Sequence, residues 1–300
     1  MDNPRIGFIG LGMMGHGMAK NLLAKGFPLS VKVNRDRSRL GDILGAGARE
    51  CATNADVAAN ADVVILCVTG SPQVEEIVFG ANGLLGAARK DLVIIDTSTS
   101  EPGMTARCRE ALAARGATFV DAPLARTPKE AEEGRLNAMV GADDATFARV
   151  RPVLAAFCEN IFHVGPPGAG HTLKLVNNFM ALTIAASIAE AFAVAAKAGV
   201  RLDKLFEVVS QGALNSNIFQ MIGGGAVAGD LTRMKFSIVN AAKDLRYYMH
   251  LAESLPVAAY LGAAVQQSYS QAVALGFGDK LIASMIEAQE KANGLRILAA

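Results

Sequence analysis

The chain is poor in the residues that build disulfide frameworks and zinc centres. Among its 300 residues there is no tryptophan, and the four cysteines, Cys51, Cys67, Cys108 and Cys158, are scattered without a CxxC pair. The four histidines show no metal-ligand spacing, so the sequence predicts neither disulfides nor a metal site. With 29 basic and 28 acidic residues, the formal net charge of +1 gives no bulk field that would attract nucleic acid or an anionic membrane.

One long apolar run is present, and it has to be tested as a membrane span. Between Leu175 and Ala196 the only charged residue is Glu190. Asn177, Asn178 and Glu190 argue against a span, because an acidic residue at its centre costs about 2.5–3.5 kcal/mol on insertion scales. Much of the run is alanine, which suits close helix packing. The first five residues lack the pattern of a signal peptide, so we expect a cytoplasmic protein without a membrane partner.

The clearest local motif is a glycine-rich turn near the N-terminus. Ile6–Ile9 is typical of a short buried strand, a helix should follow to about Lys25, and the turn between them is Gly10-Leu11-Gly12-Met13-Met14-Gly15. This is the dinucleotide-binding fingerprint in its required strand–turn–helix context. The first glycine allows the turn, the second lets the backbone approach a pyrophosphate, and the third lets the helix pack on the strand. The helix N-terminus favours phosphate, so these six residues are predicted to bind the cofactor.

The end of the second predicted strand indicates which cofactor is bound. An NAD site usually offers a carboxylate here to the ribose 2′-OH, whereas this chain continues after Val33 with Asn34, Arg35, Asp36 and Arg37. Arginine can bind a 2′-phosphate bidentately. As alternatives, Arg35 is an ordinary surface side chain, or Asp36 still reaches the ribose. We expect a preference for NADP(H), with NAD(H) possible, and place Asn34, Arg35 and Arg37 in the cofactor site.

Strand-like and helical segments alternate through the first half of the chain. Further strands are predicted at Leu29–Val33, Val63–Val68, Leu92–Asp96, Thr118–Asp121, Asn137–Val140 and Ile161–Val164. Helical stretches separate most of them, which is typical of a doubly wound, mainly parallel sheet. The segment Gly165-Pro166-Pro167-Gly168 then breaks the chain, and the remainder is predicted to be helical, with breaks at Gly223–Gly225 and Gly276–Asp279.

The predicted fold class is therefore α/β in the first half and all-helical in the second. Residues 1–164 should form a Rossmann-type dinucleotide-binding domain, and residues 165–300 a helical domain for substrate binding and oligomerisation. Residues 165–197 would link the domains through a long helix from about Ala169 to Lys197, which would span roughly 40 Å.

A lysine stands at the start of the apolar run. In one helix Gly170, Lys174, Asn177 and Asn178 share a face, because positions three and four apart are neighbours. The residues beside the lysine are apolar, and a helix that is apolar all round is normally buried. Burial disfavours the charged form of a lysine, which suits it to proton transfer. Lys174 is the predicted acid/base; the alternatives are a solvated lysine and asparagines that merely satisfy backbone groups.

Four motifs, in order along the whole chain, resemble the β-hydroxyacid dehydrogenases. They are the glycine-rich turn, Asp96-Thr97-Ser98-Thr99, the helix with Gly170, Lys174, Asn177 and Asn178, and the late Lys243-Asp244-Leu245. The resemblance implies a homodimer or homotetramer in which Lys174 is catalytic and Asn178 places the substrate or the lysine. It also implies that Thr99 lies near the nicotinamide and that Lys243 lines the closed cleft. Val68, at the end of a predicted strand, is expected to contact the cofactor as well.

One stretch departs from the family pattern. Where the family usually has Asp-Ala-Pro-Val-Ser-Gly-Gly, this chain has Asp121-Ala122-Pro123-Leu124-Ala125-Arg126-Thr127, similar to the Gly-Arg-Thr of sulfolactaldehyde reductase. This segment follows a strand at the carboxyl edge of the sheet, where open α/β folds bind ligands. A guanidinium suits a carboxylate or a sulfonate. We expect Arg126, with Ala125 and Thr127, to hold the acidic end of the substrate; a structural ion pair with the acidic residues that follow is the alternative.

Together these patterns predict an NAD(P)-dependent oxidoreductase that interconverts a small β-hydroxyacid and its semialdehyde. Two alternatives remain. One is an imine reductase, although those relatives generally carry Asp or Tyr where this chain has Lys174. The other is a non-catalytic cofactor-binding scaffold, like a chromatin-associated relative without the lysine. His16 and His171, near predicted helix starts, are assigned structural roles.

Overall fold

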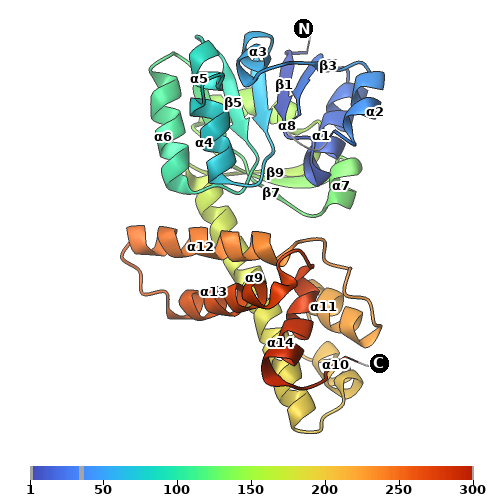
Figure 1. Cartoon of the computed structure of the whole chain (residues 1–300). Helices are drawn as coiled ribbons and strands as arrows, with labels where there is room; N and C mark the ends of the chain where they lie inside the picture. Colours follow the sequence, from blue (N-terminus) through green and yellow to red (C-terminus); the bar gives the residue numbers. More distant parts are fainter. Residues whose placement is uncertain (1–2, 34–36, 299–300) are drawn as a thin grey trace. The chain divides into compact units, whose positions relative to one another are not determined.

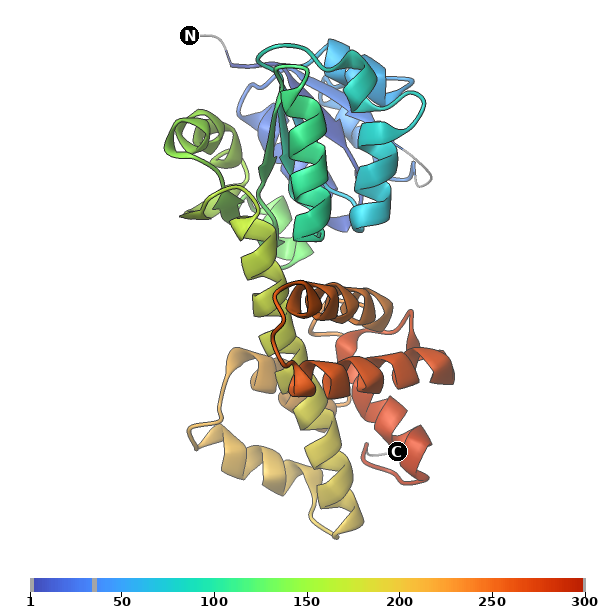
Figure 2. The ribbon, with the colours of Figure 1, turned by 90° about the vertical axis from the view of Figure 1, so that its left-hand side faces the viewer.

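The computed structural model describes residues 3–33 and 37–298, and the chain divides into two compact units, Met1–Lys174 and Leu175–Ala300 (Figures 1 and 2). The predicted α/β fold followed by an all-helical part is confirmed. The long helix α9 (Ala169–Lys197) has the predicted bounds and crosses the division between the units. The domain boundary predicted between residues 164 and 165 lies ten residues before that division and stays a prediction.

A nine-stranded sheet forms the centre of the first unit. Its order is β3-β2-β1-β4-β5-β6-β8-β7, with β9 paired to β8. The strands are β1 (Ile6–Ile9), β2 (Leu29–Lys32), β3 (Arg49–Glu50), β4 (Val63–Leu66), β5 (Val93–Asp96), β6 (Thr118–Asp121), β7 (Leu124–Ala125), β8 (Leu136–Gly141) and β9 (Cys158–Gly165). Strands β1 to β6 pair in parallel in the order 3-2-1-4-5-6 of dinucleotide-binding sheets, whereas β8 is antiparallel to β6 and β7. The chain order reverses between β1 and β4, which is where such sheets bind their ligand.

Helices cover both faces of the sheet, which explains why its strands are apolar on both sides. One core contains residues of α1 (Met13–Ala24), α2 (Leu40–Gly45) and α8 (Asp144–Leu154). The opposite core contains residues of α3 (Asn54–Ala59), α4 (Ser71–Phe79), α5 (Leu84–Ala87) and α6 (Pro102–Ala113) (Figure 1). Successive strand residues such as Phe8 and Ile9 enter opposite cores, because side chains alternate along a strand. The short α7 (Pro128–Glu132) packs on α1.

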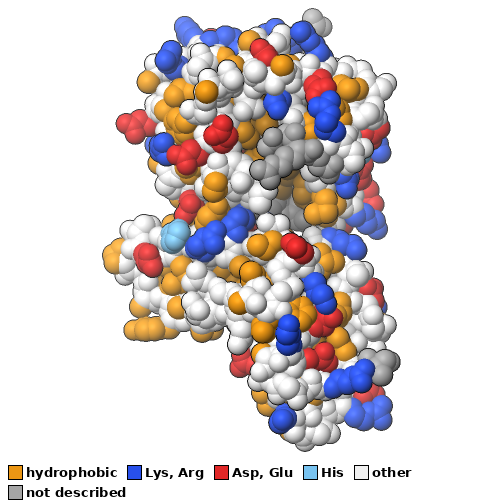
Figure 3. Space-filling model, in the orientation of Figure 1, with side chains coloured by type: hydrophobic (Ala, Val, Ile, Leu, Met, Phe, Trp, Pro, Cys, Tyr) orange, Lys and Arg blue, Asp and Glu red, His pale blue; other side chains and the backbone are white. Residues whose placement is uncertain are grey.

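The second unit is a helical bundle with its own core. Beyond α9 it contains α10 (Leu202–Ser210), α11 (Asn217–Val227), α12 (Ile238–Ser254), α13 (Tyr260–Ala272) and α14 (Met285–Asn293). A π-helical turn, Val273–Phe277, and a 3₁₀ turn, Ile282–Ser284, precede α14. Buried residues such as Leu182, Phe192, Ile222, Leu245 and Tyr269 form the core. In Figure 3, basic and acidic side chains are interspersed over both units on the face that is drawn.

The predicted strands are present, with ends that differ by at most three residues. Two strands, β3 and β7, were not predicted, because two residues are too few to give a periodic pattern. The predicted break after β9 is confirmed, since β9 ends at Gly165 and α9 begins at Ala169. The break at Gly276 is confirmed as well, because this residue has a φ of 91° inside the π-helical turn.

The predicted break at Gly223–Gly225 is wrong, because these glycines lie inside α11 and are buried. A Cβ atom on Gly223 would lie 3.2 Å from Cζ of Phe192, and one on Gly225 would lie 2.5 Å from the carbonyl oxygen of Asp230. Close packing therefore requires glycine here. A run of glycines has the same appearance in sequence whether the backbone turns or another segment lies against it.

The expectation that the start of α9 is buried all round is also wrong. Leu175 is fully buried, but its neighbours Leu173 and Val176 are 41% and 36% exposed, and Met180 is 60% exposed. By length and composition α9 is apolar enough to cross a membrane, the one such helix in the described part of the chain. Leu182 and Phe192, however, belong to the core of the helical bundle, as expected of a core helix.

Candidate active site

The glycine-rich turn has the geometry that dinucleotide binding needs. Gly10 has a φ of 108°, and a Cβ atom on it would lie 2.2 Å from the carbonyl oxygen of Cys67. A Cβ atom on Gly15 would lie 1.9 Å from the carbonyl oxygen of Gly10, so only glycine lets α1 pack this closely on the turn. Gly12, between them, is exposed, and no atom lies within 4 Å of where its Cβ would be. The turn is tight at Gly10 and Gly15 and open at Gly12, the glycine that is predicted to approach a pyrophosphate.

The start of α1 adds the electrostatic part of this arrangement. Gly12 is the N-cap residue, and the first turn of the helix carries no acidic side chain. Of the other turn residues, Leu11 is buried, Met14 is half-buried, and Met13 is 57% exposed. The unpaired amides at this helix end favour an anion.

The loops after β4 and β5 meet next to the switch point of the sheet, which lies between β1 and β4. The Val68 amide donates to Oγ of Ser98 at 3.0 Å, which ties the two loops together. The buried Asp96 accepts from the Ser98 amide at 2.9 Å and from Oγ of Ser100 at 3.0 Å. Thr99, between these two serines, is half-buried. The structure thus fixes the backbone on either side of Thr99 and places Val68 next to Gly10.

A buried aspartate at the end of β6 holds the N-terminus of α9. The carboxylate of Asp121 accepts from the Gly168 amide at 2.7 Å and from the His171 amide at 2.9 Å. A Cβ atom on Gly170 would lie 2.4 Å from the carbonyl oxygen of Met139 and 2.8 Å from Oδ2 of Asp121, so the helix meets the sheet without space for a side chain. Lys174, half-buried, follows Gly170 by one helical turn.

His171 fastens the same helical turn to the opposite core. Its ring is fully buried, with Nδ1 2.6 Å from Oγ1 of Thr105 on α6 and Nε2 3.7 Å from Oδ2 of Asp96. The structural role assigned to His171 agrees with these contacts. Because Asp96 also holds the Ser98 and Ser100 loop, the ring lies between α9 and the backbone around Thr99.

The second unit brings together predicted residues that are distant in sequence. Nδ2 of Asn178 donates to Oδ2 of the buried Asp244 at 2.6 Å, and Nζ of Lys243 lies 2.8 Å from Oδ1 of the same carboxylate. Nζ of Lys243 also lies 5.0 Å from the ring centroid of Tyr247. The exposed Asn177 donates to Oδ1 of Asn178 at 3.3 Å. Asp244 was not predicted as a site residue. Its place in the Lys243-Asp244-Leu245 motif could have indicated it.

The predicted anion-binding segment lies where the sheet becomes antiparallel. Ala125 pairs with Asn137 of β8, and Arg126 follows with a φ of 82°. Nη1 of Arg126 donates to the carboxylate of Glu159 on β9 and to the carbonyl oxygen of Arg135. The ion pair is therefore with a distant carboxylate and not with the acidic residues that follow Arg126.

Thr127 caps the helix that follows. Its amide donates to Oε2 of Glu130 at 3.0 Å, and its hydroxyl donates to the same carboxylate, as in a capping box. This bonding holds the pKa of the Glu130 carboxyl below its usual range.

The segment predicted to bind the adenosine side of the cofactor is described in part. Asn34, Arg35 and Asp36 lie outside the described residues. Arg37 is described, and its Nη1 and Nη2 atoms lie 2.8 and 2.9 Å from the two carboxylate oxygens of Glu50 on β3. The guanidinium of Arg37 holds the pKa of the half-buried Glu50 carboxyl below its usual range.

Comparison with known proteins agrees with this geometry in both halves of the chain. The NAD-binding domain of 6-phosphogluconate dehydrogenase matches residues 5–165, and the NAD-binding domain of NADP-dependent 3-hydroxyisobutyrate dehydrogenase matches residues 168–288. The chain belongs to the β-hydroxyacid dehydrogenase family. Members of this family are NAD(P)-dependent oxidoreductases, so the predicted family, enzyme class and use of NAD(P)(H) are confirmed.

Individual relatives cover almost the full length. The chain is 31% identical to the 2-(hydroxymethyl)glutarate dehydrogenase of Eubacterium barkeri, over 98% of this chain and 97% of that protein. It is 33% identical to the 3-sulfolactaldehyde reductase of Escherichia coli, over 97% of each. The structure of Mycobacterium tuberculosis 3-hydroxyisobutyrate dehydrogenase with L-serine superposes with a TM-score of 0.85 at 27% identity, over 95% of this chain and 98% of that one. These relatives act on hydroxyacids or semialdehydes, and the imine reductases of known structure are more distant.

Substituting Gly12→Ala tests the glycine turn without disturbing the fold. The backbone of Gly12, with φ −74° and ψ −164°, accepts alanine, and its Cβ would contact no protein atom. The methyl group would, however, fill space that the pyrophosphate is predicted to need next to the backbone. We expect an unchanged melting temperature and a Kd for NADP+ that rises about tenfold or more, measured by calorimetry. Gly103→Ala, on α6 with equally open surroundings, is the control; equal Kd values for Gly12→Ala and wild type would contradict the assignment.

Proposed function

We propose that the protein interconverts a short anionic semialdehyde and its β-hydroxyacid, with Lys174 as the acid/base. The bound nicotinamide supplies or accepts the hydride at the carbonyl carbon. In reduction, the ammonium of Lys174 donates a proton to the carbonyl oxygen; in oxidation, the neutral amine accepts it from the hydroxyl. The supporting observation is the anchoring of α9 by Asp121, because it fixes the height of Lys174 above the carboxyl edge of β6.

Asn178 is proposed to position the substrate or Lys174 from one turn further along α9. Its amide nitrogen is committed to Asp244, so its side-chain orientation is set before any ligand binds. We propose that Lys243, which pairs with the same carboxylate, contributes to the cofactor or substrate site from α12. An imine reductase is the weaker alternative, because this chain has lysine where those enzymes generally have Asp or Tyr.

For the cofactor, we propose a preference for NADP(H) over NAD(H), with Arg35 as the main contact of the 2′-phosphate. Arg37 contributes only if its guanidinium exchanges Glu50 for the phosphate, since both of its terminal nitrogens contact that carboxylate. Asn34 replaces the carboxylate that would repel a 2′-phosphate.

For the substrate, we propose that Arg126 binds the carboxylate or sulfonate group, with Ala125 and Thr127 forming the adjoining wall. A relative that is 33% identical reduces a sulfonated aldehyde, which supports an anion of this kind. The side chain of Arg126 is 29% exposed and paired with Glu159, so the substrate anion has to replace or join that carboxylate.

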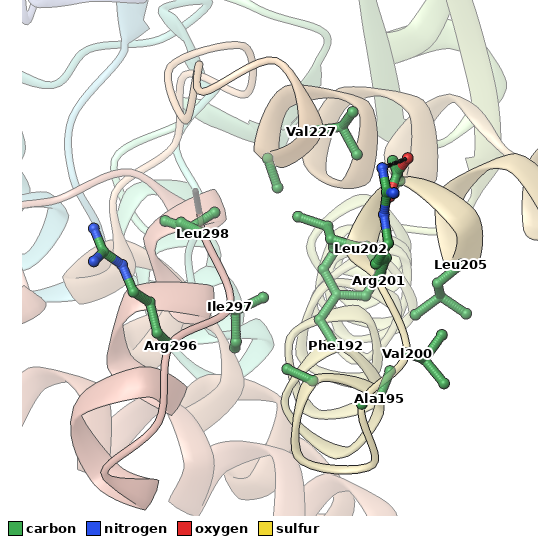
Figure 4. Close-up of a pocket in the computed structure, with 14 residues that line it drawn as sticks. Phe192, Ala195, Val200, Arg201, Leu202, Leu205, Val227, Arg296, Ile297 and Leu298 are labelled. Atoms are coloured by element: carbon green, nitrogen blue, oxygen red, sulfur yellow. Dashed lines mark hydrogen bonds and ion pairs between the residues drawn. The ribbon is translucent and has the colours of Figure 1, made fainter. Parts of the chain in front are cut away.

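We propose a cytoplasmic homodimer or homotetramer with a small-molecule substrate. The second unit exposes Val208 and Leu214 by 71% and 77%, and α10 contains no buried residue. A cavity of about 690 Å³ in this unit is lined by Leu202, Ile297 and Leu298, whose side chains face it in Figure 4. Such apolar surface is typical of a subunit contact, and the molar mass in solution from light scattering tests this assignment.

The cofactor preference is tested by steady-state kinetics with both reduced cofactors. We expect kcat/KM to favour NADPH over NADH by about tenfold or more, because a bidentate arginine–phosphate contact contributes about 1.5–3 kcal/mol. Arg35→Ala should remove most of this preference and Arg37→Ala less, since Arg37 is engaged with Glu50. A clear advantage for NADH in the wild type would show the preference to be wrong.

Lys174→Ala should abolish turnover and leave cofactor binding and folding intact. An acid/base group typically contributes about 10²–10⁴-fold to the rate. Lys197→Ala, at the exposed end of the same helix, is the matched control and should retain wild-type kcat. If Lys174→Ala keeps more than about a tenth of the wild-type kcat, the lysine is not the acid/base.

Arg126→Ala should mainly raise KM for anionic semialdehydes, by the equivalent of about 2–3 kcal/mol for a lost charge-assisted bond. The loss should be much smaller for a neutral aldehyde of the same length. Arg135→Ala is the control, since that exposed arginine pairs with Glu133 and the substitution keeps the carbonyl that accepts from Arg126. Equal losses on the two substrates would identify Arg126 as a structural residue that only pairs with Glu159.

A further inference from the structure

His16 lies between two carboxylates, one on each ring nitrogen. Nδ1 is 2.5 Å from Oε1 of Glu132 on α7, and Nε2 is 2.6 Å from Oδ2 of Asp42 on α2. The imidazole belongs to α1 and is only 12% exposed. The third charged group at this cluster is Lys20, also on α1, whose Nζ lies 3.4 Å from Oε2 of Glu132.

This geometry requires a protonated ring. A carboxylate only accepts hydrogen bonds, and a neutral imidazole has one N–H to donate, whereas the imidazolium has two. Burial lowers the pKa of His16, but the hydrogen bonds to Glu132 and Asp42 outweigh it, so the pKa is raised above its ordinary value. The pKa of Asp42 is correspondingly lowered by His16.

The three elements that His16 joins all adjoin the predicted ligand sites. The His16 amide donates to the Gly12 carbonyl at 3.1 Å, so it closes the first turn of α1 after the pyrophosphate turn. Helix α2, which carries Asp42, follows the segment with Arg35 and Arg37. Helix α7, which carries Glu132, begins directly after Thr127.

We propose that His16 is a positioning residue that couples cofactor binding to pH: its imidazolium holds α2 and α7 against α1 around the dinucleotide site. When the ring loses one proton, one of the two carboxylates no longer receives a hydrogen bond. The two negative charges then flank a neutral ring. Either α2 or α7 then loses its hydrogen bond to His16, and the cofactor meets a less ordered site, although Asn21 still bonds the carbonyls of Ala131 and Glu132.

The sign of the effect follows from the raised pKa. The attachment is complete below the ordinary histidine pKa of about 6.5 and is lost as pH rises through the higher pKa of the folded protein. Linkage is reciprocal, so a cofactor that favours the attached state must also raise the pKa of His16. A difference of one pKa unit between free and bound protein corresponds to about a tenfold change in Kd.

The test compares Kd for NADP+ between pH 6 and pH 9 in wild type and in His16→Gln, measured by calorimetry without substrate. At each pH, the Kd of the variant is divided by the Kd of the wild type. Protonation of the cofactor affects both constants equally and cancels in this ratio. We expect the wild type to bind more tightly than the variant at pH 6, by about threefold to tenfold, and the two to converge at pH 9. His163→Gln is the control, because His163 is partly exposed and, among the described residues, pairs with a single carboxylate, that of Asp144 at 3.6 Å.

Nuclear magnetic resonance titration of the His16 ring in the wild type gives a second readout that needs no variant. The pKa should exceed 6.5 in the free protein and rise further with NADP+. A ratio of Kd values that stays constant with pH, or a His16 pKa that NADP+ leaves unchanged, would overturn the proposal. Because the measurement is of cofactor binding alone, an error in the proposed substrate or in the role of Lys174 would not affect it.

Discussion

Asp121 carries a carboxylate that is fully buried at the end of β6, and two backbone amides at the start of α9 bind it. A buried charge without such partners would be strongly destabilising. Here the amides of Gly168 and His171 and the positive end of a 29-residue helix compensate it. The position of Lys174 depends on this interaction, because the lysine follows the anchored turn by only three residues.

The anchored turn also explains the residues around it. Gly170 has to be glycine because the helix touches the Met139 carbonyl and the Asp121 carboxylate. The fully buried His171 ring places Nδ1 2.6 Å from Oγ1 of Thr105, so the ring has a polar partner within a closed core. Asp96, close to the same ring, orders the loop that carries Thr99. Two buried carboxylates at the ends of neighbouring strands therefore organise the backbone on which the chemistry is proposed to occur.

Charged side chains near the ligand sites already have protein partners. Arg126 pairs with Glu159, Arg37 with Glu50, and His16 with two carboxylates. Such pairs keep the positive groups oriented before a ligand arrives, at the cost of competition with the ligand anion. The two arginine pairs are partly exposed and contribute little to stability, which is compatible with the proposed exchange of their carboxylates for a ligand phosphate or sulfonate.

The sequence by itself determined the elements whose signals are local. The glycine spacing of the turn, the apolar strands and the bounds of α9 all come from periodicity and backbone requirements within a few residues. The apolar helix pattern led to Lys174 and the family motifs to Asn178 and Lys243, and the functional roles of all three stay predictions. Only the tertiary structure decided which residues meet: Asp244 with Asn178, Glu159 with Arg126, and Asp42 and Glu132 with His16. These pairs are separated by 26 to 116 residues, and the packing of the chain, not its local pattern, brings them together. For the same reason the buried glycines of α11 appeared to be a turn, since the atoms that exclude a side chain there belong to other segments.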